Sequence, residues 1–554
     1  MHGKTLHLEN SRRGRVNPLW TLIAVGVVLT VLMLGLLRRV NSTASATAIV
    51  PLRLYCAAGM RVPVEQIVAQ YHTDYGVPVE IQYGGSNTLL NQLQVNRSAD
   101  ADLFLAADEF YLDKAIKLGL ADDVIPIAYT IPVLAVPRGN PAGIKSLADL
   151  LRPDVRIAIA DPDQAAIGKA VRERLQQTPH ADGDMWGQLL PQITARGVLK
   201  PTVNDVANDL KLGAVDAGFV WDSTLAMPDY REVLKRVPAA ELTTEPDVIA
   251  VTRLNSSSQP AAAARLVRFL AARDKGLTVF RQFGVLPVDG DAWSEQPELT
   301  FFCGAVNRRV VDQIVQDFQR DEGVAVNTIY DGCGILTSRM KTIDQQRPDL
   351  GFPDLYMACD RYYLDDIEQV RGWFLEAAYV SEADLVLVVK KGDTRVRELA
   401  DLLKPEIRVA IGQPDQCTIG VLSWKMLEDA GLADQMRDKL QRPDQVVVEK
   451  SSSSHLVPDV VTGHIDAAIA YVTDTLSVRD QVDVIPIQLP GSKAIQPITI
   501  ARSSDHKYLA RRLFRRIASS RLAFESAGFR YRSHDQQAES GETSPASSVH
   551  EARP

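Results

Sequence analysis

The chain has 554 residues, of which 46% are hydrophobic and 23% are charged. This composition is typical of globular proteins, and the length is sufficient for two or more domains. The formal net charge of -8, without a cluster of Lys and Arg, argues against a nucleic-acid-binding protein, because phosphate contacts need clustered cations.

The first predicted element is an apolar segment near the N-terminus. Residues 19–37 form an uncharged run of 19 residues, close to the ~20 that cross a hydrocarbon core of ~30 Å. Four basic residues precede the run and two follow it, so the positive-inside rule places residues 1–18 in the cytoplasm. We therefore expect a transmembrane anchor, followed by a linker at residues 38–50 and an exported remainder.

A cleavable signal peptide is the alternative interpretation of this segment. Ala44-Ser45-Ala46 has the small-x-small pattern of a cleavage site. The apolar run is longer than the ~7–15 residues of a usual signal core, and Arg38 and Arg39 lie before the cleavage site, which favours an uncleaved anchor.

An internal repeat determines the predicted architecture of the rest of the chain. Residues 147–164 match residues 399–416, at an offset of 399 - 147 = 252. Two helical stripes of apolar residues repeat at an offset of 311 - 64 = 247, and they consist of Val64, Ile67, Val68 and Tyr71, and of Val311, Ile314, Val315 and Phe318. We predict repeat 1 at residues 51–292, repeat 2 at residues 298–531, and a disordered polar tail at residues 532–554.

Each repeat is predicted to be an α/β unit of two lobes. Short β-rich runs alternate with amphipathic helices, a pattern that predicts parallel-type sheets. A unit of about 240 residues is large for one such sheet, which favours two lobes with a ligand cleft between them.

The predicted ligand site lies in the turns that lead from strands into helices, because open parallel sheets bind ligands at the carboxyl ends of their strands. In repeat 1 these turns are rich in small residues, which let backbone N–H groups approach a ligand. Helix N-termini favour negative charge, so a small anion is the expected ligand. Ser86 and Asn87 are equally interpretable as helix caps.

Across residues 51–531, each repeat resembles the periplasmic molybdate/tungstate-binding proteins of ABC importers. The resemblance implies two tandem units of the type II periplasmic-binding-protein fold, and binding of a tetrahedral oxyanion by backbone N–H groups and hydroxyls. Carried over to repeat 1, the ligand-binding residues are Ala58, Gly59, Ser86, Asn87, Ala165, Ala166, Val206 and Trp221. Gly59 lacks the hydroxyl of the family's first serine, and Trp221 offers an indole N–H where the family has tyrosine.

Repeat 2 departs further from the family pattern. Its corresponding ligand-binding residues are Val306, Cys333, Gly334, Cys417, Thr418, Leu456 and Tyr471. The tyrosine is present, but the hydroxyls of the first two loops are missing, so the resemblance predicts oxyanion binding less well for this repeat.

Four of the five cysteines fall at predicted cleft positions of repeat 2, namely Cys303, Cys333, Cys359 and Cys417. Three interpretations stay open: a thiol-lined metal site for a soft ion such as Cu(I) or Zn(II) or for arsenite, disulfides across the cleft, or small buried hydrophobic residues. Cys56 of repeat 1 has no such partners and is expected to be a buried small residue.

Motifs of catalysis are missing from the sequence: it has no HExxH, GxSxG or Walker-type pattern. We therefore expect a binding protein that is not an enzyme, requires no cofactor, binds a small oxyanion and delivers it to an ABC permease. The alternatives are a receptor or sensor for a thiophilic ligand in repeat 2, and a thiol-dependent enzyme on the same fold.

Overall fold

The computed structural model describes residues 50–95, 101–180, 183–347, 350–365, 372–489 and 491–533. The chain separates into two compact units, Met1–Pro51 and Leu52–Pro554, and the second unit contains both repeats. The predicted membrane-spanning run at residues 19–37 lies outside the described residues, as does nearly all of the predicted tail. Within the described ranges, no helix is both long and apolar enough to span a membrane.

Lobe one of repeat 1 is built on a six-stranded sheet with the order β13-β4-β12-β3-β1-β2. Its strands are β1 (Leu52–Ala57), β2 (Val79–Gly84), β3 (Leu103–Ala106), β4 (Ile125–Thr130), β12 (Asp247–Arg253) and β13 (Leu286–Pro287). Its helices are η1 (Ala58–Met60), α2 (Arg61–Tyr75), α3 (Ser86–Val95), α4 (Phe110–Lys117), α9 (Pro260–Leu270) and α10 (Gly276–Gln282). The predicted apolar stripe on α2 is confirmed, because its four residues are buried and the helix ends at Gly76 with a φ of 69°.

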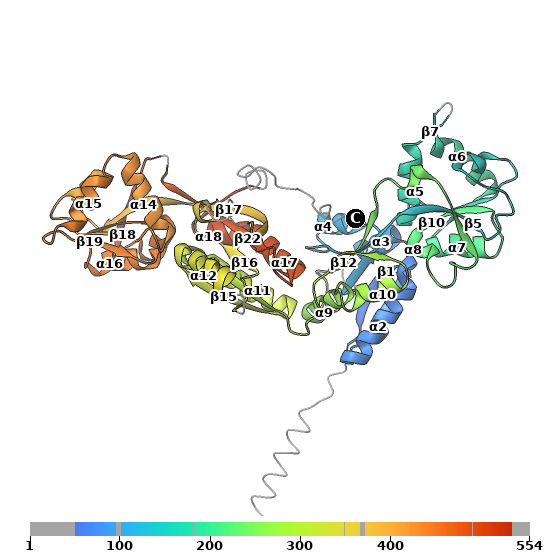
Figure 1. Cartoon of the computed structure of the whole chain (residues 1–554), viewed down its shortest axis with the longest axis horizontal. Coiled ribbons are helices and arrows are strands. Elements are labelled where there is room, and N and C mark those ends of the chain that lie inside the picture. Colours follow the sequence, from blue (N-terminus) through green and yellow to red (C-terminus); the bar gives the residue numbers. More distant parts are fainter. Residues whose placement is uncertain are drawn as a thin grey trace, which may run out of the picture. The chain divides into compact units, whose positions relative to one another are not determined.

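Lobe two of repeat 1 has a five-stranded sheet with the order β11-β5-β10-β6-β9. Its strands are β5 (Pro132–Pro137), β6 (Ile157–Ala160), β9 (Val198–Lys200), β10 (Ala217–Trp221) and β11 (Leu234–Val237), beside a short hairpin of β7 (Pro179–His180) and β8 (Gly183–Asp184). Helices α5, α6 and α7 pack around this sheet (Figure 1). The helices are η2 (Leu147–Leu151), α5 (Ala166–Gln176), α6 (Met185–Arg196), α7 (Val203–Lys211), α8 (Asp222–Leu225) and η3 (Ala240–Leu242).

The sheets are mixed, which corrects the prediction of parallel-type sheets. The strands β1, β2 and β3 are parallel to one another, as are β6, β9 and β10, but β12 and β5 run antiparallel to their neighbours. The physical reason is the two crossings between the lobes. Both β5 and β12 enter their lobe from the cleft and run away from it, whereas the parallel strands end at the cleft.

Repeat 2 follows the same plan with one merged sheet, in the order β15-β14-β16-β22-β17-β20-β18-β19 with β21 and β23 on β17. Its strands are β14 (Glu298–Gly304), β15 (Ala325–Asp331), β16 (Leu355–Met357), β17 (Phe374–Lys390), β18 (Val409–Gly412), β19 (Val447–Lys450), β20 (Ala467–Tyr471), β21 (Val482–Pro486), β22 (Lys493–Ala501) and β23 (Arg530–Tyr531). Its helices are η4 (Ala305–Asn307), α11 (Arg308–Glu322), α12 (Cys333–Gln346), η6 (Leu399–Leu403), α14 (Thr418–Asp429), α15 (Ala433–Gln441), η7 (Ser453–His455), α16 (Leu456–Thr462), η8 (Val472–Val478), α17 (Lys507–Ala518) and α18 (Arg521–Ser526).

The merged sheet has a local cause at the crossing between the lobes. In repeat 1, β4 and β5 are separate strands, and Pro132 at the start of β5 has no N–H to donate to a ladder. In repeat 2, Leu385 pairs with Tyr471 as Pro132 pairs with Trp221, the N–H of Leu385 donates to the carbonyl oxygen of Ser492, and β17 runs unbroken from one lobe into the other. Its first part pairs with β22 and its second part with β20 and β21.

Each repeat has its own hydrophobic core. One cluster of buried residues extends from Leu52 to Val288, and a second extends from Leu299 to Phe529. The predicted stripe of α11 belongs to the second cluster, and this helix ends at Gly323 with a φ of 63°. The separate cores mean that apolar burial stabilises each repeat largely by itself.

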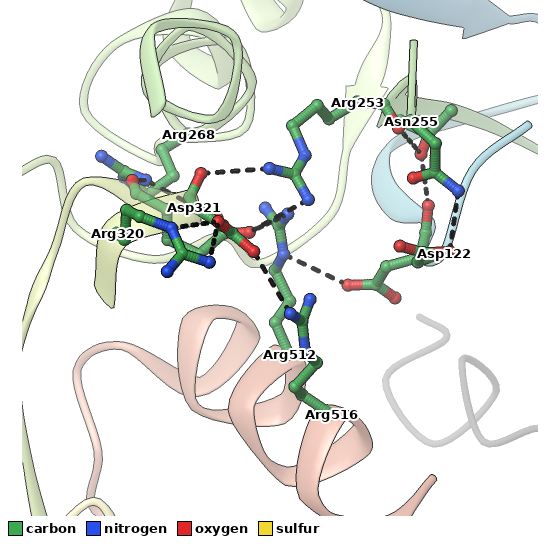
Figure 2. Close-up of polar contacts among 11 residues, drawn as sticks. Asp122, Arg253, Asn255, Arg268, Arg320, Asp321, Arg512 and Arg516 are labelled. Carbon is green, nitrogen blue, oxygen red and sulfur yellow. Dashed lines mark hydrogen bonds and ion pairs between the residues drawn. The ribbon is translucent and has the colours of Figure 1, made fainter. Parts of the chain in front are cut away.

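Polar contacts connect elements of the two repeats around the end of α11 (Figure 2). Glu322 is only 3% exposed and accepts a hydrogen bond of 2.7 Å from Arg512 of α17. Its carboxylate also lies 3.9 Å from Arg253 of β12 and 3.9 Å from Arg268 of α9. Arg512 in turn lies 3.3 Å from Asp123 of repeat 1. A buried carboxylate needs such cations, because an unpaired buried charge is strongly destabilising.

Candidate functional site

The candidate site of repeat 1 is a small cavity between its two lobes, with a volume of about 20 Å³. This exceeds the ~10–15 Å³ that one water molecule needs. The lining residues are Ala57, Ala58, Gly59, Gly84, Gly85, Ser86, Ala107, Ala165, Ala166, Ile167, Thr202, Val203 and Trp221. Six of the residues predicted from the sequence are therefore brought together: Ala58, Gly59, Ser86, Ala165, Ala166 and Trp221.

The cavity lies where strands end and helices begin. Strand β1 leads into η1 and α2, β2 into α3, β6 into α5, and β10 into α8. The residue before α5, Ala165, and the residue before α8, Trp221, provide no side-chain cap to the helix that follows. The first N–H groups of a helix have no partner within the helix, so helix starts offer hydrogen-bond donors and the positive ends of helix dipoles. At the start of α3, the N–H groups of Asn87 and Thr88 already donate to the carbonyl oxygen of Gln164.

Glycines allow the two lobes to approach each other at this point. A Cβ atom on Gly85 would lie 2.3 Å from the carbonyl oxygen of Gln164 in lobe two. A Cβ atom on Gly59 would lie 3.1 Å from Cγ1 of Val203. Any side chain at position 85 would therefore push the lobes apart, whereas glycine permits them to close around the cavity.

Two hydroxyl groups supply polar side chains near the cavity. Oγ of Ser86 accepts a hydrogen bond of 3.3 Å from the N–H of Ala107. The hydroxyl of Thr224 is buried, has no hydrogen-bond partner among the described residues, and lies 3.5 Å from the position of a Cβ on Gly59. The residues that line the cavity carry no charge at all. Thr224 was not predicted as a ligand residue, because in the sequence a threonine after a strand resembles an ordinary helix cap.

One predicted ligand residue, Asn87, lies elsewhere in the closed cleft. The side-chain amide of Asn87 donates a hydrogen bond of 2.7 Å to the carbonyl oxygen of Asp163, so it connects the lobes and does not line the cavity. Asn204 makes a second connection, donating to the carbonyl oxygen of Ala58 at 2.8 Å. These two bonds hold lobe one against lobe two.

Val206, which was also predicted as a ligand residue, does not line this cavity. Val206 is fully buried in α7, and its Cγ1 would lie 2.8 Å from a Cβ on Gly218 of the lobe-two sheet. As the fourth residue of the helix, its N–H is the first with an intrahelical partner. Thr202 and Val203 line the cavity instead, and the capping box of Thr202 and Asp205 was the sequence signal for this helix start.

In repeat 2, the predicted ligand residues are buried at the equivalent turns. The set consists of Val306, Cys333, Gly334, Cys417, Thr418, Leu456 and Tyr471. Leu456 begins α16 and is fully buried, like Val206 of repeat 1. The hydroxyl of Tyr471 is buried without a hydrogen-bond partner among the described residues. Gly334 donates its N–H to the carbonyl oxygen of Gln416, as Asn87 of repeat 1 does to Gln164.

A larger cavity lies in repeat 2, and it was not predicted from the sequence. Its volume is about 350 Å³, and Val306, Arg309, Ser454 and Asp474 are among the residues that line it. Burial raises the pKa of Asp474 to about 6, against the opposing effects of a hydrogen bond with Ser453 and the charge of Arg309. At an offset of 250, Asp474 occupies the position of Thr224.

The expected metal site of Cys303, Cys333, Cys359 and Cys417 does not form as one cluster. In the part of the chain that the structure describes, no group of three or more Cys, His, Asp or Glu side chains is arranged to hold a metal. Cys303 points its thiol to the carbonyl oxygen of Gly304, and Cys417 to those of Gln413 and Lys450. Only Cys333 and Cys359 have sulfur atoms in contact, at 2.9 Å.

The chain is similar to several known proteins over a little under half of its length. A Haemophilus influenzae protein, whose name describes an inferred binding role, is 30% identical over 236 residues, which are 43% of this chain and 91% of that protein. The molybdate-binding protein ModA of Mycobacterium bovis is 28% identical over 261 residues, 46% of this chain and 94% of the relative. The solved periplasmic molybdate-binding protein of Azotobacter vinelandii is 23% identical with a TM-score of 0.36, and the match covers 42% of this chain and 98% of that structure.

One family model matches the chain twice, at residues 52–286 and again at residues 299–530. The two matches together cover most of the chain and correspond to the two hydrophobic cores. The chain therefore belongs to the bacterial extracellular solute-binding proteins, and it carries two copies of their domain in tandem.

Proposed function

We propose that repeat 1 is a receptor for a small tetrahedral oxyanion, of the molybdate or tungstate type, which it encloses between its lobes. The observation that carries this proposal is the convergence of several strand-to-helix turns, made of small residues, on one small uncharged cavity.

Neutral donors suit such an ion. Backbone N–H groups at helix starts and the hydroxyls of Ser86 and Thr224 can all donate hydrogen bonds to oxygen atoms of an anion. Donors in a site that excludes water are worth more than in solution, and hydrogen bonds to a charged group are about twice as strong as neutral ones. An anion without a neighbouring cation would be held by this field and still be released when the lobes separate.

Lobe closure is the second element of the proposal. The hydrogen bonds of Asn87 and Asn204 connect the lobes directly, and Gly85 allows their close contact. Hinge closure around a ligand is a common transition of two-lobed binding proteins. In the closed state the cavity has room for only a few atoms, which favours a small inorganic ion over a sugar or a peptide.

Delivery to a membrane permease of the ABC type is the proposed outcome of binding. The extracellular family and the expected anchor at residues 19–37 support a receptor tethered outside the cytoplasmic membrane. No catalytic step enters this function.

Calorimetric titration of the purified full chain, in mild detergent because of residues 19–37, tests the proposal. Molybdate, tungstate, sulfate and phosphate are titrated separately. We expect one molybdate or tungstate ion to bind per chain, in competition with each other. The absence of binding by all four ions at millimolar concentration would refute the oxyanion receptor, and tight binding of sulfate or phosphate alone would refute the molybdate type.

A further inference from the structure

Two cysteines of repeat 2 are in direct contact at the base of its cleft. Cys333 is the first residue of α12, and Cys359 follows β16. Their sulfur atoms lie 2.9 Å apart, and the backbone N–H of Cys359 donates to Sγ of Cys333 at 3.0 Å. Cys333 is 0% exposed and Cys359 is 5% exposed, so the pair is covered in the closed cleft.

The two thiols differ in acidity. Burial favours a raised pKa for Cys333, but the hydrogen bond between its thiol and that of Cys359, together with the one it accepts from the backbone N–H of Cys359, outweighs burial and lowers the pKa. The pKa of Cys359 is raised well above its usual range by its hydrogen bond with the Cys333 side chain and by burial. Cys333 is therefore the more acidic thiol of the two, as the attacking cysteine is in pairs that consist of an attacking and a resolving cysteine.

The other three cysteines lack this arrangement. Cys56 and Cys303 occupy equivalent positions in the two repeats, and each points its thiol to the carbonyl oxygen of the next residue. Burial raises the pKa of both thiols, and it raises that of Cys417 to about 11. Their thiolates are therefore scarce.

Repeat 1 shows that the fold itself does not need the pair. At the positions of Cys333 and Cys359 it has Ser86 and Ala107, and the N–H of Ala107 donates to Oγ of Ser86. The backbone contact is thus the same in both repeats, and repeat 2 differs by having two sulfur atoms at it.

Space around the pair favours a bond between the sulfur atoms over a bound ion. A Cβ on Gly304 would lie 2.3 Å from Sγ of Cys359 and 2.8 Å from Sγ of Cys333. The neighbouring backbone therefore packs directly on both sulfur atoms. Within the described residues, no third Cys, His, Asp or Glu completes a metal site there.

We propose that Cys333 and Cys359 are a reversible redox pair, which is oxidised to a disulfide by exchange with a small-molecule disulfide when the cleft of repeat 2 opens. The Cys333 thiolate attacks one sulfur atom of the reagent and releases the other as a thiolate. The released thiolate takes the proton of Cys359, whose sulfur then attacks Cys333 and displaces the second thiolate. The Cys333 thiolate and the Cys359 thiol are oxidised together to a disulfide, and the reagent disulfide is reduced to one thiol and one thiolate.

Cleft opening controls access to the pair. Gly334 and Ile335 donate their N–H groups to the carbonyl oxygen of Gln416 in lobe two, and Thr418 of lobe two lies beside Cys333. The closed lobes therefore cover the sulfur atoms. Oxidation would also remove the negative charge from the start of α12, where the helix dipole favours an anion.

Glutathione disulfide is the probe for the test on the full chain, followed by alkylation and peptide mass spectrometry. We expect one cross-link, between the peptides of Cys333 and Cys359, with loss of two of the five free thiols and reversal by dithiothreitol. The Cys303→Ser variant is the matched control in the same cleft and should form the same cross-link. No cross-link in the folded chain, or one that joins Cys333 to another cysteine, would overturn the proposal.

Two further variants, Cys359→Ser and then Cys333→Ser, distinguish the roles of the two thiols. In Cys359→Ser, the mixed disulfide with glutathione should accumulate on Cys333, because no resolving thiol remains. In Cys333→Ser, Cys359 should stay unmodified. Glutathione on Cys359 in the second variant, or on Cys417 or Cys303 in the first, would contradict the assignment. Circular dichroism of both variants verifies that they are folded.

Discussion

The two repeats keep the same frame around their clefts and differ in what they place there. In repeat 1, the N–H groups of Asn87 and Thr88 donate to the carbonyl oxygen of Gln164. In repeat 2, Gly334 and Ile335 donate in the same way to Gln416. The backbone contact between lobes is therefore common to both.

The side chains at the cleft differ between the two repeats. Repeat 2 has Val306 at the position of Gly59 and Cys333 at the position of Ser86. The serine hydroxyl beside the cavity of repeat 1 therefore corresponds to a cysteine sulfur atom that contacts Cys359 in repeat 2. Thr224 is replaced by Asp474, beside the larger cavity of repeat 2. The difference indicates that closure of the lobes is a property of the frame, whereas the choice of ligand depends on a few side chains at helix starts.

The largest expected effect concerns the polar contacts between the repeats. Glu322→Ala leaves Arg512 and its neighbouring arginines without their buried carboxylate, which should cost about 3–5 kcal/mol of stability. Scanning calorimetry of the full chain should show a lower midpoint temperature for the unfolding transition that includes α11. Glu80→Ala, which removes an exposed pair with Arg53, is the control and should change stability by less than about 1 kcal/mol. An equal effect of both variants would contradict the importance of the buried carboxylate.

Substitutions that keep one cleft at a time from closing test most directly whether the two repeats differ in ligand binding. Gly85→Ala places a Cβ against Gln164, so repeat 1 should fail to close and lose about 100-fold in molybdate affinity, or ~2.7 kcal/mol. Gly332→Ala is the matched variant, because its Cβ would lie 2.3 Å from the carbonyl oxygen of Gln416 in repeat 2. It should leave that affinity unchanged in calorimetric titrations. The opposite result would move the oxyanion site to repeat 2.

A smaller effect is expected from the hydroxyl at the cleft. Ser86→Ala removes one donor to the anion and should weaken molybdate binding by about tenfold, or ~1.4 kcal/mol. Cys333→Ala changes the equivalent position in repeat 2 and should have no effect on this affinity. If Ser86→Ala binds as the wild type does, the serine acts only as a support for the Ala107 backbone.

Much of the fold was predictable from the sequence because the same sequence patterns occur in both repeats. The stripes of α2 and α11 and the glycines that end these helices appear at one offset, and the structure has both helices with the same stripe buried. The prediction of parallel-type sheets did not include the antiparallel strands β5 and β12. Strands that enter a lobe from the cleft have the same β-rich composition as strands that end there, so direction cannot be read from composition.

The candidate site was predictable only in part. Small residues in strand-to-helix turns indicated Gly59, Ala165 and Ser86, because the turn itself determines which residues face the cleft. Val206 lies outside the cavity, because it is the fourth residue of α7 and Thr202 and Val203 at the helix start line the cavity. Contacts between distant segments, such as that of Cys333 with Cys359, depend on tertiary packing and have no local signal.

The smallest expected effect is a dependence of repeat 1 on pH. Burial raises the pKa of Asp247 to about 7, although Arg174 lies 2.7 Å from its carboxylate and opposes the rise. A raised folded-state pKa contributes stability that is present below the unfolded pKa and is lost as pH rises. From pH ~5.5 to pH ~6.5, repeat 1 should therefore lose about 1 kcal/mol.

Asp247→Asn should abolish that loss, since an amide does not titrate, and hydrogen exchange of repeat 1 peptides at the two pH values measures it. Asp216→Asn is the control. Arg156 lowers the pKa of Asp216, so its contribution to stability is lost only in more acidic solution and is constant in this range. If the slope persists in Asp247→Asn, or disappears in Asp216→Asn, another group carries the pH dependence and the buried carboxyl on β12 is ionised throughout.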